Sequence, residues 1–129
     1  PGDVIGQSLS RINPYQIECL TNVEVSLLPS ELWHQVLDTE FRHIQQAEEL
    51  LSIVHCKSSE LCLMQLLLWL ARKFGCEVNQ GKLINLRLTH QEIAETTGMA
   101  RVTVTRLLNH FEREGKICRC RQQLILLSN

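Results

Sequence analysis

The chain has 129 residues, of which 44% are hydrophobic and 21% are charged, and its net charge is −1. This composition is ordinary for a globular protein and excludes disordered and collagen-like chains. The longest apolar run, from Leu66 to Ala71, is too short to cross a bilayer, and nothing near Pro1 resembles a signal peptide, so we expect a cytoplasmic protein with no membrane partner.

The charge is unevenly distributed along the chain. Residues 1–86 hold six Lys and Arg against ten Asp and Glu, a net charge of −4, whereas residues 87–129 hold seven against four, a net charge of +3. A basic segment in a chain that is otherwise acidic indicates a nucleic-acid partner for that segment.

The first 38 residues are typical of the end of a β structure. PGDVIG at residues 1–6 predicts a turn followed by a short strand, and VEVSLL at residues 23–28 predicts another strand. Because two strands cannot bury a useful core, we expect them to belong to a larger sheet domain. After Pro29, Ser30 is the expected cap of a short helix to Leu37. Its inward-facing residues are predicted to be Leu32, Trp33 and Val36.

Residues 39–55 predict a long helix with a coiled-coil seam. Apolar residues recur there at near-heptad spacing, with charges between them. Such a stripe would otherwise be left in water, which favours a homodimer formed through a two-fold seam. A helix packed within one protomer is the alternative. The expected seam residues are Phe41, Ile44, Leu51 and Val54, with Ala47 or Glu48 between them and His55 as the alternative to Val54.

Residues 58–88 predict a core helix and a strand. The helix begins at Ser58 or Ser59, runs to about Phe74 and is apolar nearly all round, so it must lie in the centre of its domain. Gly75 ends it, residues 79–81 make a turn, and residues 84–88 alternate as a strand.

Residues 88–114, LTHQEIAETTGMARVTVTRLLNHFERE, carry the most specific pattern in the chain. Thr89 and Glu92 have the spacing of a capping box, which fixes the start of a helix. Gly98 can take the positive φ that a sharp turn needs. A second helix follows from about Arg101, with an apolar side formed by Val104, Leu107, Leu108 and Phe111. The sequence therefore predicts a helix-turn-helix.

The other side of that second helix is polar and holds no glutamate before Glu112. Such a side suits a helix that lies in a groove between two phosphate backbones. An αα-hairpin with a solvated charged face is the alternative. The polar residues are Arg101, Thr103, Thr105, Arg106 and Asn109.

The last residues predict a β-hairpin, with strands at 117–120 and 124–127 and a polar turn at 121–123. Together the predicted elements make an α+β chain that ends in a winged helix. Basic residues of the hairpin, Lys116, Arg119 and Arg121, are expected to add salt-dependent contacts to phosphates.

The cysteines form no CxxC pair and no zinc-knuckle spacing. We expect them to be buried free thiols, and we expect no metal site. Packing accounts for Cys118 and Cys120 on one face of the hairpin. The six are Cys19, Cys56, Cys62, Cys76, Cys118 and Cys120.

With these motifs the chain resembles the Crp/Fnr family of bacterial transcription regulators, and in RVTVTRLL and WLARKFG the cyanobacterial nitrogen-control branch. PGDVIG is similar to the family's PGDxFGE turn near the effector pocket, and VEVSLLPSELWHQVL to its last sensor strand and the helix after it. The resemblance implies the end of a cyclic-nucleotide-binding-like β-roll sensor domain at residues 1–38, without its front part. It also implies a dimerisation helix at 39–57 and a winged helix-turn-helix DNA-binding domain at 58–129.

The resemblance also implies roles for single residues. Contacts to base edges are expected from Arg101, Val102 and Arg106. Contacts to phosphates are expected from Thr89, Gln91 and Thr103. Val102 can make only apolar contacts, for instance with a thymine methyl. The resemblance to the nitrogen-control branch implies GTA and its complement TAC as the half-sites. Ala100 stands where the family usually has a Ser or Thr cap.

The effector side departs from the family pattern. Gly6 is followed by Gln7 where cyclic-nucleotide binders have a glutamate, and PYQIEC at residues 14–19 holds no arginine. A cyclic nucleotide is therefore not expected, and the nitrogen-control resemblance implies 2-oxoglutarate as a candidate. His43 falls where that branch has an effector-binding arginine, with Arg42 beside it.

We therefore expect a homodimeric, sequence-specific transcription regulator that binds double-stranded DNA and acts with RNA polymerase. One alternative is a redox- or metal-sensing regulator that uses its cysteines, and another is an interaction module that binds no DNA. An enzyme is the poorest alternative, and no catalytic residue is expected, because the sequence has no phosphate-cradling glycine loop and no nucleophile elbow.

Overall fold

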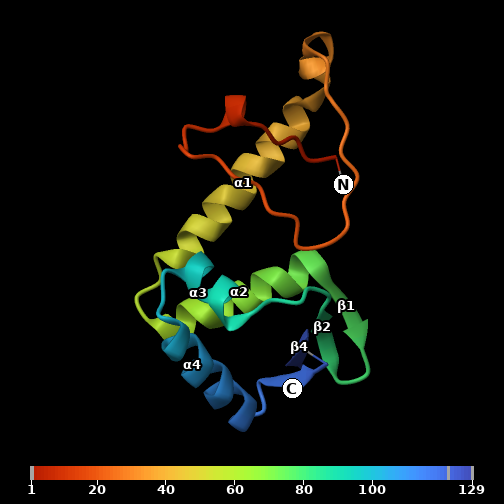
Figure 1. Cartoon of the computed structure of the whole chain (residues 1–129). Helices are drawn as coiled ribbons and strands as arrows, with labels where there is room; N and C mark the ends of the chain where they lie inside the picture. The colour runs from red at the N-terminus through yellow and green to blue at the C-terminus, as the bar shows by residue number, and fades with distance from the viewer. Residues whose placement is uncertain (1, 122, 129) are drawn as a thin grey trace. The chain divides into compact units, whose positions relative to one another are not determined.

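A computed structural model describes residues 2–121 and 123–128. Pro1 of the expected first turn, Gln122 of the hairpin turn and Asn129 at the end of the last expected domain lie outside the described residues. The chain forms two compact units, residues 1–49 and residues 50–129. Figure 1 traces the elements in chain order. No helix in the described ranges is both long and apolar enough to span a membrane.

The first unit contains helical elements and, within residues 2–49, no strand. Two 3₁₀ helices span Gln7–Leu9 and Ser30–Val36, and helix α1 runs over Leu37–Val54, its last turn belonging to the second unit. The strands expected at residues 1–6 and 23–28 are therefore wrong for the described residues. The physical reason is that a strand is stabilised by hydrogen-bonded neighbours, and two short strands are too few to form a sheet with a buried face.

The short helix before α1 is present, but its apolar side chains do not face inward as predicted. Leu32 is 38% exposed and Trp33 is 51% exposed, while Val36 is half-buried. The helix follows Pro29, which makes no side-chain cap bond, and the Ser30 hydroxyl donates to the Glu31 carboxylate at 3.3 Å. With no sheet in the described part of this unit, there is no sheet surface for these side chains to pack against.

Helix α2, Ser59–Phe74, is the central element of the second unit. The Ser58 hydroxyl caps it by accepting from the backbone N–H of Leu61 at 3.1 Å. The expected core helix is confirmed, since seven of its residues are buried: Cys62, Leu63, Leu66, Leu67, Trp69, Leu70 and Ala71.

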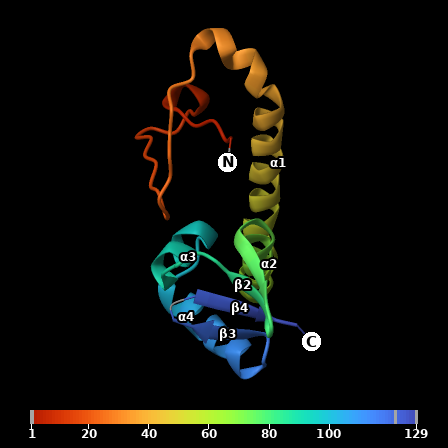
Figure 2. The same ribbon diagram turned by 90° about the vertical axis from the view of Figure 1, so that its right-hand side faces the viewer.

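A four-stranded antiparallel sheet with the order β1-β2-β4-β3 completes this unit. β1 (Gly75–Val78) and β2 (Gly81–Ile84) form one hairpin, and β3 (Ile117–Cys120) and β4 (Gln123–Leu127) form the other. Figure 2 shows the neighbouring strands β2, β4 and β3 beside α4. The C-terminal hairpin is confirmed. The strand expected at residues 84–88 is wrong, because the strand there begins earlier and ends at Ile84.

Gly81 explains where β2 begins. Its φ is +147°, and a Cβ at this position would overlap the carbonyl oxygen of Leu126 on β4. Only glycine allows the two backbones to approach this closely, so Gly81 can pair with Leu127 and carry the register on to Ile84 opposite Leu124.

One hydrophobic core holds α2, the sheet and the two following helices, α3 (His90–Thr97) and α4 (Arg101–Arg113). Its deepest side chains come from all of these elements. They include Leu63, Leu66 and Leu67 of α2, Ile84 of β2, Ile93 of α3, Val104, Leu108 and Phe111 of α4, and Ile117 of β3.

Two valines on α4 allow the core packing to be tested. Val104→Ala should lower the free energy of unfolding by about 2 kcal/mol, because Val104 is completely buried and its truncation leaves a cavity. Val102→Ala is the matched control, since Val102 is 79% exposed on the same helix and the change in helix propensity is the same at both positions. Urea denaturation measures both variants. Equal losses of stability would contradict the burial of Val104.

Candidate nucleic-acid interface

The start of α3 is held by the capping box that the sequence predicts. The Thr89 hydroxyl accepts from the backbone N–H of Glu92 at 3.2 Å, and the Glu92 carboxylate accepts from the backbone N–H of Thr89. The hydrogen bond from the Thr89 backbone, and after it the one from the Thr89 side chain, holds the pKa of the Glu92 carboxyl below its ordinary value.

The turn between α3 and α4 is made at Gly98, whose φ of 68° is in the left-handed region. Its N–H donates to the carbonyl of Ala94, which satisfies one of the carbonyls at the end of α3. Ala100 then precedes α4. It makes no side-chain cap bond, because its methyl group cannot accept a hydrogen bond. The predicted helix-turn-helix is confirmed in both helices and in the turn.

Helix α4 has a buried apolar side and an exposed basic side. Val104, Leu107, Leu108 and Phe111 are all buried. Because 3.6 residues make a turn, this burial places the residues between them at the surface. The exposed side lines an open depression formed by Arg101, Val102, Thr105, Arg106, Asn109 and Arg113.

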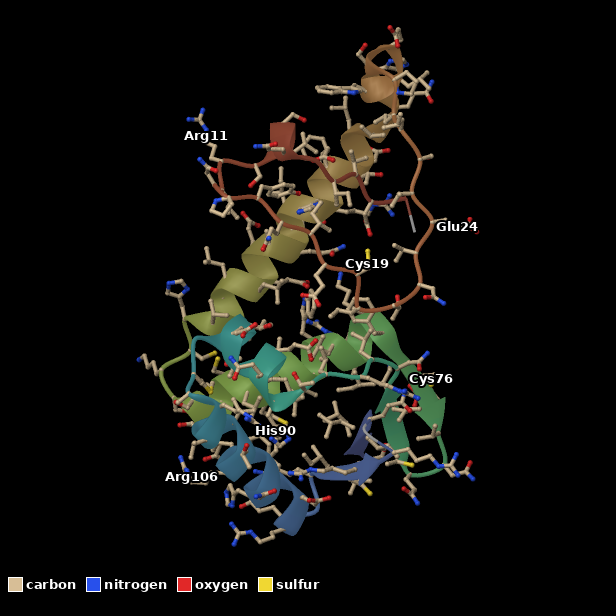
Figure 3. All side chains as sticks on the ribbon, viewed as in Figure 1. Arg11, Cys19, Glu24, Cys76, His90 and Arg106 are labelled. Atoms are coloured by element: carbon tan, nitrogen blue, oxygen red, sulfur yellow. The ribbon has the colours of Figure 1, made fainter. Side chains whose placement is uncertain are left out.

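The structure thus brings together the three residues that were predicted to read bases. Arg101, Val102 and Arg106 are all exposed, and they share this depression. Figure 3 shows Arg106 pointing away from the body of its unit. The six residues that line the depression include three arginines and no acidic residue, so its local charge is positive.

The residues predicted to contact phosphates lie in different places. Thr89 lines a second depression, of about 370 Å³, together with Arg87, His90 and Arg119. Gln91 is exposed and its side-chain amide donates to Glu95 at 2.7 Å. Thr103 is half-buried and lines a separate depression beside the turn, so the structure does not group it with Thr89.

Two of the three basic residues of the C-terminal hairpin have acidic or amide partners. Lys116 Nζ lies 2.7 Å from Glu114 Oε2, and this hydrogen bond raises the pKa of Lys116 and lowers the pKa of Glu114. The Arg119 guanidinium donates to the Asn109 side chain at 2.7 Å. Its Nε also lies 3.6 Å from the Glu112 carboxylate. These contacts fasten the hairpin, which forms the wing, to the end of α4.

Arg121 occupies the turn of the wing. It is exposed and has a φ of 45°, and it is the one residue other than glycine with a positive φ in the described ranges. Its side chain is therefore presented to solvent by the tip of the hairpin, as a contact to a phosphate would require.

Acidic residues and a histidine gather at the far end of α4. His110 Nε2 lies 3.3 Å from Glu114 Oε1 and 4.0 Å from Glu60 Oε1 at the start of α2. Lys116 Nζ lies 4.0 Å from the same Glu60 oxygen. The cluster joins α2, α4 and the residue before β3 by polar contacts at the surface, and its exposed Lys116–Glu60 ion pair contributes little to stability by itself.

Sequence reasoning missed His90, the first residue of α3. Its Nδ1 lies 2.8 Å from the Thr105 hydroxyl of α4, and it is half-buried between the two helices (Figure 3). Burial, followed by the nearby charges of Arg119 and Arg101, lowers the pKa of His90. The signal that could have found it is its place directly after the capping residue Thr89, at the start of the first helix of the helix-turn-helix.

The residues predicted for the dimer seam follow one side of α1. Phe41, Ile44 and Leu51 are exposed, and Val54 is half-buried. Leu37, four residues before Phe41, extends this side and is also exposed. The seam residues therefore form an apolar surface stripe in the single chain.

The residues predicted for the effector lie in two elements of the first unit. Gly6 and the exposed Gln7 are at the start of the first 3₁₀ helix, and Arg42 and His43 are exposed on α1. The Arg42 guanidinium donates to the Thr39 hydroxyl at 3.1 Å. Part of its hydrogen-bonding capacity is thus used within its own helix.

All six cysteines are free thiols, but only Cys62 is buried. Burial, and then the neighbouring Cys56, raises the pKa of Cys62. Cys56 and Cys118 are half-buried, and the rest are exposed. The expectation that the thiols are buried was therefore wrong outside α2, because Cys76 and Cys120 lie on the exposed outer strands β1 and β3 of the sheet.

Comparison with known proteins gives the same fold. The model of the Crp-like helix-turn-helix domain matches residues 63–129. The regulatory protein CysR of Synechococcus elongatus is 44% identical over 131 residues, a match that covers 98% of this chain and 62% of that protein. The global nitrogen regulator of Synechocystis sp. is 34% identical over 137 residues, covering 98% of this chain and 60% of the relative. The chain thus spans about three fifths of the length of these relatives.

Among solved structures, a transcriptional regulator of the CRP family from Thermus thermophilus is similar, with a TM-score of 0.66 and 24% identity. The match covers 78% of this chain and 51% of that one. At this identity the likeness concerns the fold alone.

The capping box predicts a pH-dependent contribution to stability. Since the pKa of Glu92 is lower in the folded chain, its contribution is present above the unfolded value of about 4.3 and is lost as the pH falls through the folded value. Glu92→Ala should cost about 0.5–1 kcal/mol at neutral pH, the size of a lost cap, and less below about pH 4.

Urea denaturation at the two pH values measures this effect. Glu95→Ala is the control, because the Glu95 carboxylate accepts from the Gln91 side chain and has no role in the cap. A Glu92→Ala deficit that is the same at both pH values would contradict the assignment.

Proposed function

The chain belongs to the Crp/Fnr family of helix-turn-helix regulators, and from this premise we propose that it is a transcription regulator that binds a palindromic DNA operator as a homodimer. The observation that carries the proposal is the exposed side of α4, where Arg101, Val102 and Arg106 share one depression without an acidic residue. A helix with such a side fits the major groove, in which base edges can be read.

The three residues suggest which bases are read. Arg101 and Arg106 can each make two hydrogen bonds to O6 and N7 of a guanine, worth roughly 1–3 kcal/mol of discrimination per pair. Val102 offers only methyl groups, which suit the methyl group of a thymine. A half-site such as GTA with its complement TAC holds one guanine, which one of the two arginines can read, and thymines that suit Val102.

A palindrome requires two recognition helices about 34 Å apart, and hence two copies of the winged helix. The stripe on α1 formed by Phe41, Ile44, Leu51 and the half-buried Val54, which Leu37 extends, is the surface that we propose for the dimer. Large apolar residues at heptad spacing on an exposed helix are stabilised when a second helix covers them.

The remaining contacts supply affinity without sequence preference. Thr89, Gln91, Thr103 and the wing residues Lys116, Arg119 and Arg121 are proposed to lie against phosphates. A regulator of this kind acts on the chromosome together with RNA polymerase, so the proposal places it in the cytoplasm.

The role of Arg106 can be tested by its effect on discrimination. Arg106→Ala should reduce the preference for a GTA/TAC palindrome over variants with the guanine replaced by about 1–3 kcal/mol. Arg113→Ala is the control: it lies in the same depression at the far end of α4, and its loss should weaken all sequences alike. Fluorescence anisotropy with the palindrome and its variants measures both effects. An unchanged preference in Arg106→Ala would remove this residue from the base-reading set.

The dimer seam can be tested by placing a charge in it. Ile44→Glu should shift the protein from dimer to monomer, because two carboxylates would be brought into an apolar contact. Gln45→Glu is the matched control, since it adds the same charge one position away from the stripe. Sedimentation equilibrium over a range of concentrations measures the dissociation constant. A monomeric wild type, or equal dissociation constants for the two variants, would contradict the proposed seam.

A further inference from the structure

We propose that His90 is an ionisable ligand of the DNA backbone, which takes up a proton when a phosphate enters the depression between α3 and the wing. Operator affinity would then fall as the pH rises. This inference rests on the proposed function. It adds a contact from His90 and an uptake of a proton, neither of which DNA binding by itself requires.

The geometry gives His90 one nitrogen for the protein and one for a ligand. The Thr105 hydroxyl donates its hydrogen to the Arg101 carbonyl at 3.0 Å, so it is left to accept from His90 Nδ1 at 2.8 Å. A ring that donates from Nδ1 carries its second proton, when it is charged, on Nε2. Nε2 is thus the atom that gains or loses the proton.

The depression that His90 lines has a polar part and an apolar part. Arg87, Thr89, Arg119 and Gln123 offer two cations, a hydroxyl and an amide, and the rest of the lining is Leu88, Ile93, Leu108 and Leu124. Thr89, its neighbour in the chain, is already proposed to lie against a phosphate. A phosphate that contacts Thr89 would therefore also come within the surroundings of His90.

Charged residues near His90 lie on β3, on α4 and in the segment before α3. Arg119 lies on β3 and Arg101 on α4, and both disfavour a charged ring. Arg87, before α3, lines the same depression. Of the carboxylates, Glu92 accepts from the Thr89 backbone, and Glu112 lies 3.6 Å from Arg119 and offsets part of its charge. In the free protein burial, and after it the charges of Arg119 and Arg101, lowers the pKa of His90 and so favours the neutral ring.

A bound phosphate reverses this balance. Its negative charge offsets the arginines and accepts a hydrogen bond from the charged ring, so the pKa of His90 is higher in the complex than in the free protein. Binding is then strongest below the lowered pKa of the free protein and weakens as the pH rises through the pKa of the complex. Each unit between the two values corresponds to about tenfold in affinity per protomer.

The experiment follows the affinity of the whole chain for a GTA/TAC duplex between about pH 5.5 and pH 8, the range in which histidine titrates. Wild type should lose affinity across this range. His90→Gln should bind with a nearly flat profile, and His90→Arg should bind tightly at both ends, because its charge is permanent.

His55→Gln is the control, because this exposed histidine lies after α1 and its Nδ1 lies 2.8 Å from the Leu51 carbonyl of its own turn. It should keep the wild-type profile. A contribution from the other histidines is then common to all variants and cancels in the comparison with His90→Gln.

The salt dependence gives a second readout that a merely structural role would not move. At low pH the slope of log affinity against log salt should be steeper in wild type than in His90→Gln by about 0.9 per protomer, the effect of one more neutralised phosphate. At high pH the two slopes should converge.

The outcomes separate this inference from the function on which it rests. If wild type and His90→Gln bind the duplex with the same pH profile and the same salt slopes, the proton-linked contact is overturned and the DNA-binding function stands. If wild type binds the duplex at no pH in the range, the proposed function itself is overturned.

Discussion

The packing of α4 onto α2 and the sheet is the contact on which the rest of the second unit depends. Phe111 and Val104 are completely buried in it, two turns of helix apart. Once these side chains fix the rotation of the helix about its axis, the positions of Arg101 and Arg106 at the surface follow from helix geometry. The core therefore determines which side chains a DNA groove can meet, although no core residue would touch DNA itself.

Side chains on the polar side of α4 also brace the unit. Asn109 accepts from Arg119 of the wing, and Thr105 accepts from His90 of α3, so both neighbouring elements are held to α4 by hydrogen bonds. The two contacts orient the side chains of Arg119 and His90, which line the same depression. A side chain held in this way loses less conformational entropy on binding than a free one.

Features that depend on neighbouring residues were predicted correctly from the sequence, whereas features that depend on pairing between distant residues were not. The capping box at Thr89, the turn at Gly98 and the apolar spacing of α4 depend on residues within four or five positions, and all were found as predicted. Strand β2 was misplaced because its position depends on pairing with β4, about forty residues later, and on the close approach at Gly81. His90 was missed for the same reason, since its partner Thr105 lies on another helix.

A histidine among arginines has a physical advantage at this surface. A permanent cation at position 90 would be disfavoured by the charges of Arg119 and Arg101, whereas a neutral ring can stay half-buried and hydrogen-bonded to Thr105. The charge need then be present only when a phosphate offsets it. The net charge of −1 hides this arrangement, because the acidic first part of the sequence balances a basic surface whose local excess depends on what is bound.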